Sequence, residues 1–211
     1  MSAEELYRLL KKSYPDVVST ICRLHKPCSG ISCIYGNTQS SEVLDFDEIE
    51  RLYHTGNASS ASSVDCVTVD KNNTIFCFVE IKGWRMFLSN PGKIQNVTEK
   101  DIAAQTARYK LKEKLDSSMR LCTEISKDSR CFENMTVVYI LVTDIEVSKS
   151  PLLSLSHNLT ALSLTSTRWN DICNRYMLQK MDSIKDIKKR YICCKDFDAE
   201  LEHSVAADPQ P

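Results

Sequence analysis

The sequence predicts an α/β fold in which a central mixed β-sheet is flanked by helices. Residues 64–70 and 74–82 are rich in β-branched and aromatic side chains, and turn-forming residues 71–73 join them, which predicts a β-hairpin. Residues 135–142 are apolar almost throughout, as expected of a central strand that is covered on both faces. Helical patterns precede and follow these strands.

The first half of the chain contains two expected helices and a short strand candidate. Leucines recur at helical spacing over residues 3–12, and Pro15 ends the pattern. Residues 31–35 form the strand candidate. Asp45 is expected to cap a helix over residues 45–54, because a second acidic residue follows three positions later in a variant of the capping box.

The second half contains longer elements. Thr98 is the expected N-cap of a helix over residues 99–118, which contain neither Gly nor Pro. The Ser-rich and Leu-rich residues 148–167 fit either a loop or a short helix. Residues 169–187 are expected to be largely helical, and residues 191–194 are the candidate for a last strand.

Length and charge bound the class of protein. A chain of 211 residues suits one hydrophobic core, so we expect a single domain over residues 1–202 and a disordered tail over 203–211. The net charge is −1 and the pI is about 6.4, so the chain lacks the basic character of proteins that bind nucleic acid through charge alone. Cationic residues gather locally over 100–114 and 185–190, and the second group also fits the solvated face of a helix.

Two features indicate an intracellular location, cytoplasmic or nuclear. Apolar runs are far shorter than the roughly 20 residues of a membrane span, and the N-terminus lacks the pattern of a secretory signal. We therefore expect no membrane contact and cysteines that are mostly reduced, although the chain has ten of them. Five Asn-X-Ser/Thr sequons are the opposing indication, and such short motifs arise often by chance. They begin at Asn57, Asn72, Asn96, Asn134 and Asn158.

Charged residues at the end of the second hairpin strand are the main candidates for chemistry. Alternation along this strand places Glu80 and Lys82 on one face, next to each other in space. Asp65 lies on the partner strand and can reach the same end of the sheet. Charges in such an apolar setting are costly to bury unless they have partners or a task.

This set of residues fits the hydrolysis of phosphodiester bonds. Hard Mg²⁺ or Mn²⁺ is held by one or two carboxylates together with other oxygen atoms, so Asp65, Glu80 and the backbone carbonyl of Ile81 are the candidate metal ligands. Lys82 would position the attacking water and lower its pKa, or stabilise developing negative charge.

The segment VDCVTVDKNNTIFCFVEIK resembles the core of the PD-(D/E)XK nuclease superfamily, with Asp65 in the first signature and Glu80-Ile81-Lys82 in the second. The usual Pro before the Asp is replaced by Val64. Further along, Gln105 and Tyr109 resemble the Q-x-x-x-Y motif of the RecB and lambda-exonuclease branch. Their spacing places both on one helical face, from which they would contact a substrate strand.

The resemblance covers about residues 42–145. It implies a restriction-endonuclease-like core, a metal-dependent nuclease activity directed at DNA more than RNA, and a targeting partner subunit or a homo-oligomer. The alternative is a catalytically inactive protein of the same fold that serves as a scaffold or interaction subunit. In that case Glu80 and Lys82 form a structural ion pair.

Two further sets of residues are candidates. Members of this superfamily often carry another acid on the helix before the first signature strand, and Glu50 is our choice because it borders the expected core face of that helix. Its competitors are Glu42, Asp45 and Glu48.

Separately, a C-x2-H-x2-C-x4-C pattern has ligand types that suit Zn²⁺, and small buried cysteines near a surface histidine are the other interpretation. It is formed by Cys22, His25, Cys28 and Cys33.

Overall fold

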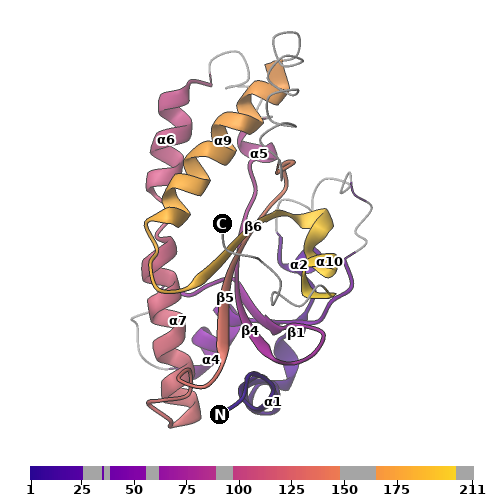
Figure 1. Ribbon diagram of the computed structural model, residues 1–211, viewed down its shortest axis with the longest axis vertical. Helices are drawn as coiled ribbons and strands as arrows, with labels where there is room; N and C mark the ends of the chain where they lie inside the picture. Colours follow the sequence, from indigo (N-terminus) through magenta and orange to yellow (C-terminus); the bar gives the residue numbers. More distant parts are fainter. Residues whose placement is uncertain (26–34, 36–38, 56–61, 89–96, 148–164, 203–211) are drawn as a thin grey trace.

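The computed structural model describes residues 1–25, 35, 39–55, 62–88, 97–147 and 165–202 (Figure 1). In these ranges the strands form one six-stranded mixed sheet in the order β1-β2-β3-β4-β5-β6. Strands β1 to β4 pair antiparallel, and β5 and β6 continue the sheet in parallel. The predicted α/β fold with a mixed sheet is therefore confirmed. The strands are β1 (Val18–Ser19), β2 (Val43–Asp45), β3 (Cys66–Val69), β4 (Ile75–Lys82), β5 (Thr136–Thr143) and β6 (Lys188–Cys193).

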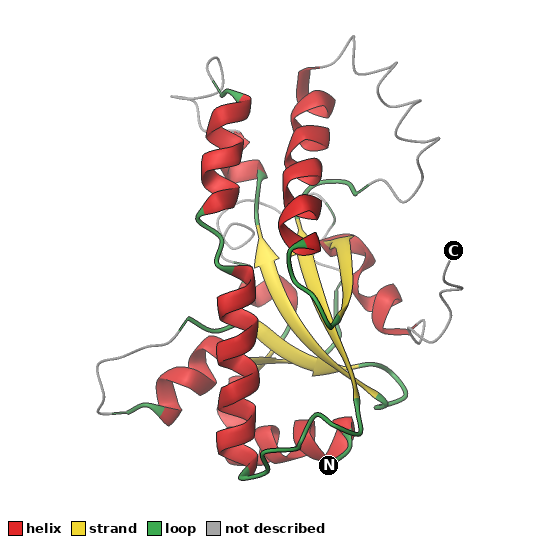
Figure 2. Cartoon of the chain, turned by 60° about the vertical axis from the view of Figure 1, so that its left-hand side comes forward, coloured by secondary structure: helices red, strands yellow, loops and turns green. Residues whose placement is uncertain are grey.

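Helices cover both faces of the sheet and create two hydrophobic cores (Figures 1 and 2). Alternation along β4 divides its side chains between them. Phe76 and Phe78 enter the larger core, and Cys77 and Val79 enter the smaller one, as the hairpin pattern predicts. The larger core is covered by α1 (Ala3–Ser13), α4 (Phe46–Tyr53), α5 (Arg85–Leu88), α6 (Glu99–Ala107), α7 (Leu111–Ser126) and α9 (Thr165–Asp182), and the smaller one by α2 (Ile21–Leu24) and α10 (Phe197–Glu202).

Local sequence signals explain several of these elements. The Asp45 carboxylate accepts a hydrogen bond of 3.0 Å from the Glu48 N–H, so the predicted cap of α4 is confirmed. Thr98 and Asp101 form a full capping box at α6. In the hairpin turn, Asn73 has a positive φ of 57°, a conformation that asparagine tolerates better than most residues.

One predicted helix is wrong in its extent. The pattern predicts a continuous helix over residues 99–118, but α6 ends at Ala107 and α7 begins at Leu111 (Figure 2). Tyr109 lies in the break, and its ring packs edge-on against the buried Trp84 with the ring centroids 5.9 Å apart. This tertiary contact outweighs the helix propensity of the surrounding residues, which is worth only fractions of a kcal/mol per residue.

The remaining differences concern short elements and boundaries. Helix α9 ends at Asp182, five residues before the predicted end, because β6 begins already at Lys188. The expectations for residues 31–34, 148–164 and 203–211 lie outside the described residues. Within the described ranges, no helix combines the length and apolar character that crossing a bilayer requires. The eight described cysteines are free thiols.

Candidate active site

Asp65, Glu80 and Lys82, the residues nominated for catalysis, meet at one end of the β3–β4 hairpin. Cys66 pairs with Val79 in the antiparallel register, so Asp65, one residue earlier, falls opposite Glu80. The Asp65 Oδ2 atom accepts a hydrogen bond of 2.5 Å from the backbone N–H of Ile81. The hairpin thus fixes the first carboxylate directly beside the second.

The Glu80 carboxylate is fully buried, with 0% of the side chain exposed, whereas Asp65 and Lys82 keep 21% and 16%. Lys82 Nζ is in direct contact with Glu80 Oε1 and lies 3.7 Å from Asp65 Oδ2. The three side chains that the sequence nominates therefore form one cluster with limited access to solvent. Burial at this level strengthens their mutual electrostatic interactions.

A fourth member of the cluster, Lys114, is contributed by α7. Its Nζ atom lies 2.8 Å from Glu80 Oε1 and 3.3 Å from Asp65 Oδ1. Two ammonium groups therefore balance two carboxylates at the end of β4. On a continuous helix Gln105 and Lys114 are nine residues apart and lie on opposite faces, at about 100° per residue, so only the break before α7 lets both serve one site.

The charges of this cluster shift one another's pKa values. Burial raises the pKa of Glu80 and the neighbouring Asp65 adds to this rise, while Lys82 and Lys114 act in the opposite direction. Burial alone would lower the pKa of Lys114, but Glu80 and Asp65 outweigh it and hold the pKa above its ordinary value. Lys114 is thus held as an ammonium.

Asp47, on the first turn of α4, is an acidic residue that the sequence interpretation missed. Although the residue is exposed at the surface, partial desolvation of its carboxylate raises the pKa of Asp47, while the Ser63 hydrogen bond lowers it. The charge of Asp65 also raises this pKa, and those of Lys114 and Lys82 lower it. Its carboxylate accepts a hydrogen bond of 2.6 Å from the Ser63 hydroxyl. The sequence signal that could have identified Asp47 is its position three residues before Glu50, which places both on the same side of the helix.

Glu50 itself is buried but takes part in none of the contacts of this cluster. It lines a small cavity of about 40 Å³ that is also lined by His54, Arg120 and Glu124. Its Oε1 atom accepts no hydrogen bond from the described residues. The structure therefore brings Asp47, rather than Glu50, into electrostatic contact with Asp65.

The other acids considered for this role have different partners. Glu42 accepts hydrogen bonds from Tyr7 and Lys11 of α1, at 2.8 Å and 2.7 Å, and ties that helix to the sheet. Asp45 caps α4, and Glu48 pairs with Arg51 on the same helix.

The Q-x-x-x-Y residues lie beside the cluster. Lys82 Nζ lies 5.4 Å from the centroid of the Tyr109 ring, within the range of a cation–π contact. The Gln105 side-chain amide donates a hydrogen bond of 3.2 Å to the Tyr109 hydroxyl. The two residues interact as their spacing predicts, although Tyr109 lies just beyond the end of α6.

The turn after β4 supports this arrangement. Asp144, at the end of β5, is buried and accepts a hydrogen bond of 2.6 Å from the Trp84 N–H. It also accepts one of 3.2 Å from the N–H of Arg85. Trp84 is thereby fixed, and its ring in turn positions Tyr109.

The oxygen donors at the end of β4 match a hard divalent cation in type. They are the carboxylates of Asp65 and Glu80 and the carbonyl of Ile81. Each already has an ammonium nearby, because Lys82 Nζ donates a hydrogen bond of 3.1 Å to the Ile81 carbonyl. Glu80 Oε1 nevertheless accepts no hydrogen bond of good geometry from the described residues. Among the described side chains, no three or more His, Cys, Asp or Glu residues are grouped so as to hold a metal ion.

The zinc candidate can be placed only in part. Cys28 and Cys33 lie outside the described residues. His25 is buried, which lowers its pKa, while the charges of Asp144 and Asp65 act to raise it. His25 is therefore near the end of β4 and in electrostatic contact with the cluster.

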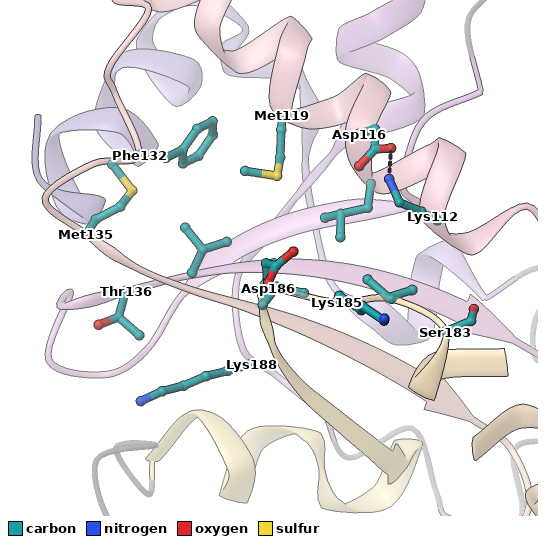
Figure 3. A pocket seen from close by; sticks show the side chains of 14 residues that line it. Lys112, Asp116, Met119, Phe132, Met135, Thr136, Ser183, Lys185, Asp186 and Lys188 are labelled. Carbon is teal, nitrogen blue, oxygen red and sulfur yellow. Dashed lines mark hydrogen bonds and ion pairs between the residues drawn. The ribbon is translucent and has the colours of Figure 1, made fainter. Parts of the chain in front are cut away.

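A separate groove of about 750 Å³ lies between α7 and the beginnings of β5 and β6 (Figure 3). Met119 and Phe132 are among its apolar lining side chains, and Lys112 and Asp116, which also line it, form an ion pair. Thr136 at its edge pairs with the first residue of β4, whereas the cluster lies at the last residues of that strand. The groove is thus remote from the charged cluster.

No family model, curated protein or solved structure matches the chain.

Proposed function

We propose that the protein is a metal-dependent nuclease with a restriction-endonuclease-like core. The observation that carries this proposal is the convergence of Asp65, Glu80 and Lys82 at one strand end, with Tyr109 stacked beside Lys82. One buried and one partly exposed carboxylate with an ammonium group, arranged in this way, suit a reaction in which negative charge accumulates on phosphate oxygens.

Asp65, Glu80 and the carbonyl of Ile81 would hold Mg²⁺ or Mn²⁺. When bound, the cation neutralises charge on the scissile phosphate. The Glu80 side chain supports this assignment, because a fully buried carboxylate at the strand end is a charged oxygen donor whose present partners are the ammonium groups of Lys82 and Lys114. Asp65 is anchored by the N–H of Ile81, and its second oxygen, which Lys114 contacts at 3.3 Å, would face the cation.

Lys82 would act on the reacting groups themselves. Hydrolysis adds the hydroxyl of water to phosphorus and leaves the proton on the departing sugar oxygen. An ammonium held between Glu80 and the Tyr109 ring can orient the water and donate a hydrogen bond to a phosphate oxygen.

The substrate would be a DNA strand that crosses the break between α6 and α7. Arg108 and Lys110 are exposed on either side of Tyr109, which places cationic side chains next to an aromatic ring and the catalytic cluster. Such a local basic site is what a chain of net charge −1 requires for contact with phosphates. A targeting partner subunit, or a second copy of this chain, would add the remaining contacts.

A second candidate function is an inactive scaffold of the same fold. The observation that favours it is the charge balance of the cluster, because Lys82 and Lys114 already neutralise Asp65 and Glu80. A structural ion-pair network of this kind contributes to the fold without binding a metal.

Incubation of the purified protein with single-stranded DNA, duplex DNA and RNA separates the two candidates. We expect cleavage of at least one DNA substrate in Mg²⁺ or Mn²⁺ and none in EDTA, because the carboxylates need the cation to act on phosphate. Cleavage that persists unchanged in EDTA, or binding of no divalent cation, would contradict the nuclease proposal and favour the scaffold.

A second expectation concerns Gln105 and Tyr109, which would orient the substrate. Replacing either by Ala is expected to slow cleavage by about tenfold or more while Mn²⁺ affinity stays nearly unchanged, since neither side chain is a good ligand for a hard cation. Tyr109→Phe is the matched control, because it keeps the ring against Lys82 and Trp84 and removes only the hydroxyl. A parallel loss of Mn²⁺ affinity in the Ala variants would refute the orienting role.

A further inference from the structure

Lys114 is held in the candidate site by its surroundings on α7. Leu111 and Leu115 flank it in the core, and the Ser118 hydroxyl accepts a hydrogen bond of 2.9 Å from the backbone N–H of Val64. Because Ser118 follows Lys114 by one helical turn, both face the segment that leads into Asp65. The burial of the two leucines and the hydrogen bond between Ser118 and Val64 therefore hold this part of α7 against the candidate site.

The Lys114 ammonium lies between the two carboxylates. It contacts Glu80 Oε1 at 2.8 Å and Asp65 Oδ1 at 3.3 Å, and only 18% of its side chain is exposed. A divalent cation that bridges Asp65 and Glu80 would need the same space and the same oxygen atoms. The Lys114 ammonium would thus have to leave the space between the two carboxylates before a divalent cation could bind there.

We propose that Lys114 is an internal counter-cation, which occupies the space between Asp65 and Glu80 in the metal-free protein and is displaced when a divalent cation binds. This inference rests on the proposed function. Lys82 is less suited to the role, because its contact with the Tyr109 ring also holds it at the side of the cluster. Displacing Lys114 would leave Lys82 in place for the reaction.

Asp47 gives the displaced ammonium an alternative partner. Asp47 is exposed at the surface of α4, and its charge already acts on Lys114. The Ser63 hydroxyl fixes it on the side of α4. The four-carbon chain of a lysine permits the ammonium to turn from one carboxylate to a neighbouring one by rotation about its own bonds. The charge that leaves the metal site would therefore stay compensated.

As an internal counter-cation, Lys114 lowers the apparent affinity for the metal and stabilises the metal-free protein. Only molecules in which Lys114 has turned away can bind the metal. If these are a small fraction of the population, the apparent dissociation constant for the metal rises in inverse proportion to that fraction. In the absence of metal, the same ammonium offsets the repulsion between the buried Glu80 carboxylate and the adjacent, partly exposed Asp65 carboxylate. Removing the Lys114 ammonium should therefore raise the affinity for the metal and lower the stability of the metal-free protein.

Calorimetric titration with MnCl₂ tests the inference. We expect Lys114→Met to bind Mn²⁺ at least about tenfold more tightly than the wild type, which corresponds to removing a competitor that occupies nine molecules in ten. The metal-free variant should also melt at a lower temperature, and Mn²⁺ should raise its melting temperature more than that of the wild type. Lys112→Met is the matched control, since Lys112 is exposed on the same helix and pairs with Asp116, and it should leave both values unchanged.

Lys114→Gln serves the same test where the Met variant does not fold, because its amide keeps a hydrogen-bond donor for Glu80. Mn²⁺ affinity equal to or weaker than that of the wild type in a folded Lys114 variant overturns the inference and leaves the proposed function standing. Absence of Mn²⁺ binding in the wild type and in every variant overturns both.

Discussion

Glu80→Gln and Asp65→Asn are each expected to lower the rate of metal-dependent cleavage by at least about a hundredfold. Each change removes a negative charge with almost no change in shape, and groups that stabilise charge in a transition state contribute two or more orders of magnitude to the rate. The Glu80 carboxylate is fully buried, so water cannot replace it as a ligand. Single-turnover cleavage of a labelled DNA strand measures the effect.

Asp116→Asn and Glu124→Gln are suitable controls, because both carboxylates are on α7 and away from the cluster. Unfolding must be followed in parallel, since Glu80→Gln leaves two partly buried ammonium groups with one carboxylate between them. Breaking such a network costs several kcal/mol in unfavourable cases. A folded Glu80→Gln variant that cleaves within about threefold of the wild-type rate would remove Glu80 from the catalytic set.

Lys82→Ala is expected to slow cleavage by a similar factor through a different step. The ammonium is no metal ligand, so Mn²⁺ should bind at least as tightly as to the wild type, while the chemical step loses a group that orients water and stabilises phosphate oxygens. A rate reduced at saturating metal and substrate is the signature of this role. Lys82→Arg is a useful companion variant, because it keeps the charge but changes the geometry.

The contradicting result would be a Lys82→Ala variant whose cleavage rate returns to the wild-type value when the Mn²⁺ concentration is raised. That outcome would mean that Lys82 supports metal binding rather than chemistry. Lys112→Ala is the matched control for the loss of one exposed lysine on the surface.

Features of the fold with local causes could be predicted from the sequence. The alternation of β4 follows from the two-residue period of a strand, and it places Phe78 and Glu80 on the opposite face from Val79. The Asp45 cap follows from local hydrogen bonding. The strands β1 and β2 have only two and three residues, too few to show a period, and were not predicted.

In the candidate site, too, the contacts with local causes could be predicted from the sequence and the long-range contacts could not. Asp65, Glu80 and Lys82 come together because the hairpin register is local, so the sequence suffices to predict their proximity. Gln105 and Lys114 face the same site because the helical pattern breaks at Tyr109, and at this break Tyr109 contacts Trp84 from another part of the chain. Residue patterns carry no direct signal for a contact of this kind.

Calorimetric titration of Mn²⁺ into the wild type, Asp65→Asn and Glu80→Gln tests the central claim most directly. The account predicts binding to the wild type and an affinity at least about tenfold weaker in each variant, because each loses a charged oxygen ligand. Folding of the three proteins is compared by circular dichroism before the titration. Failure of the folded wild type to bind Mn²⁺, or equal affinity in all three proteins, would contradict the assignment of a metal-dependent nuclease site to Asp65 and Glu80.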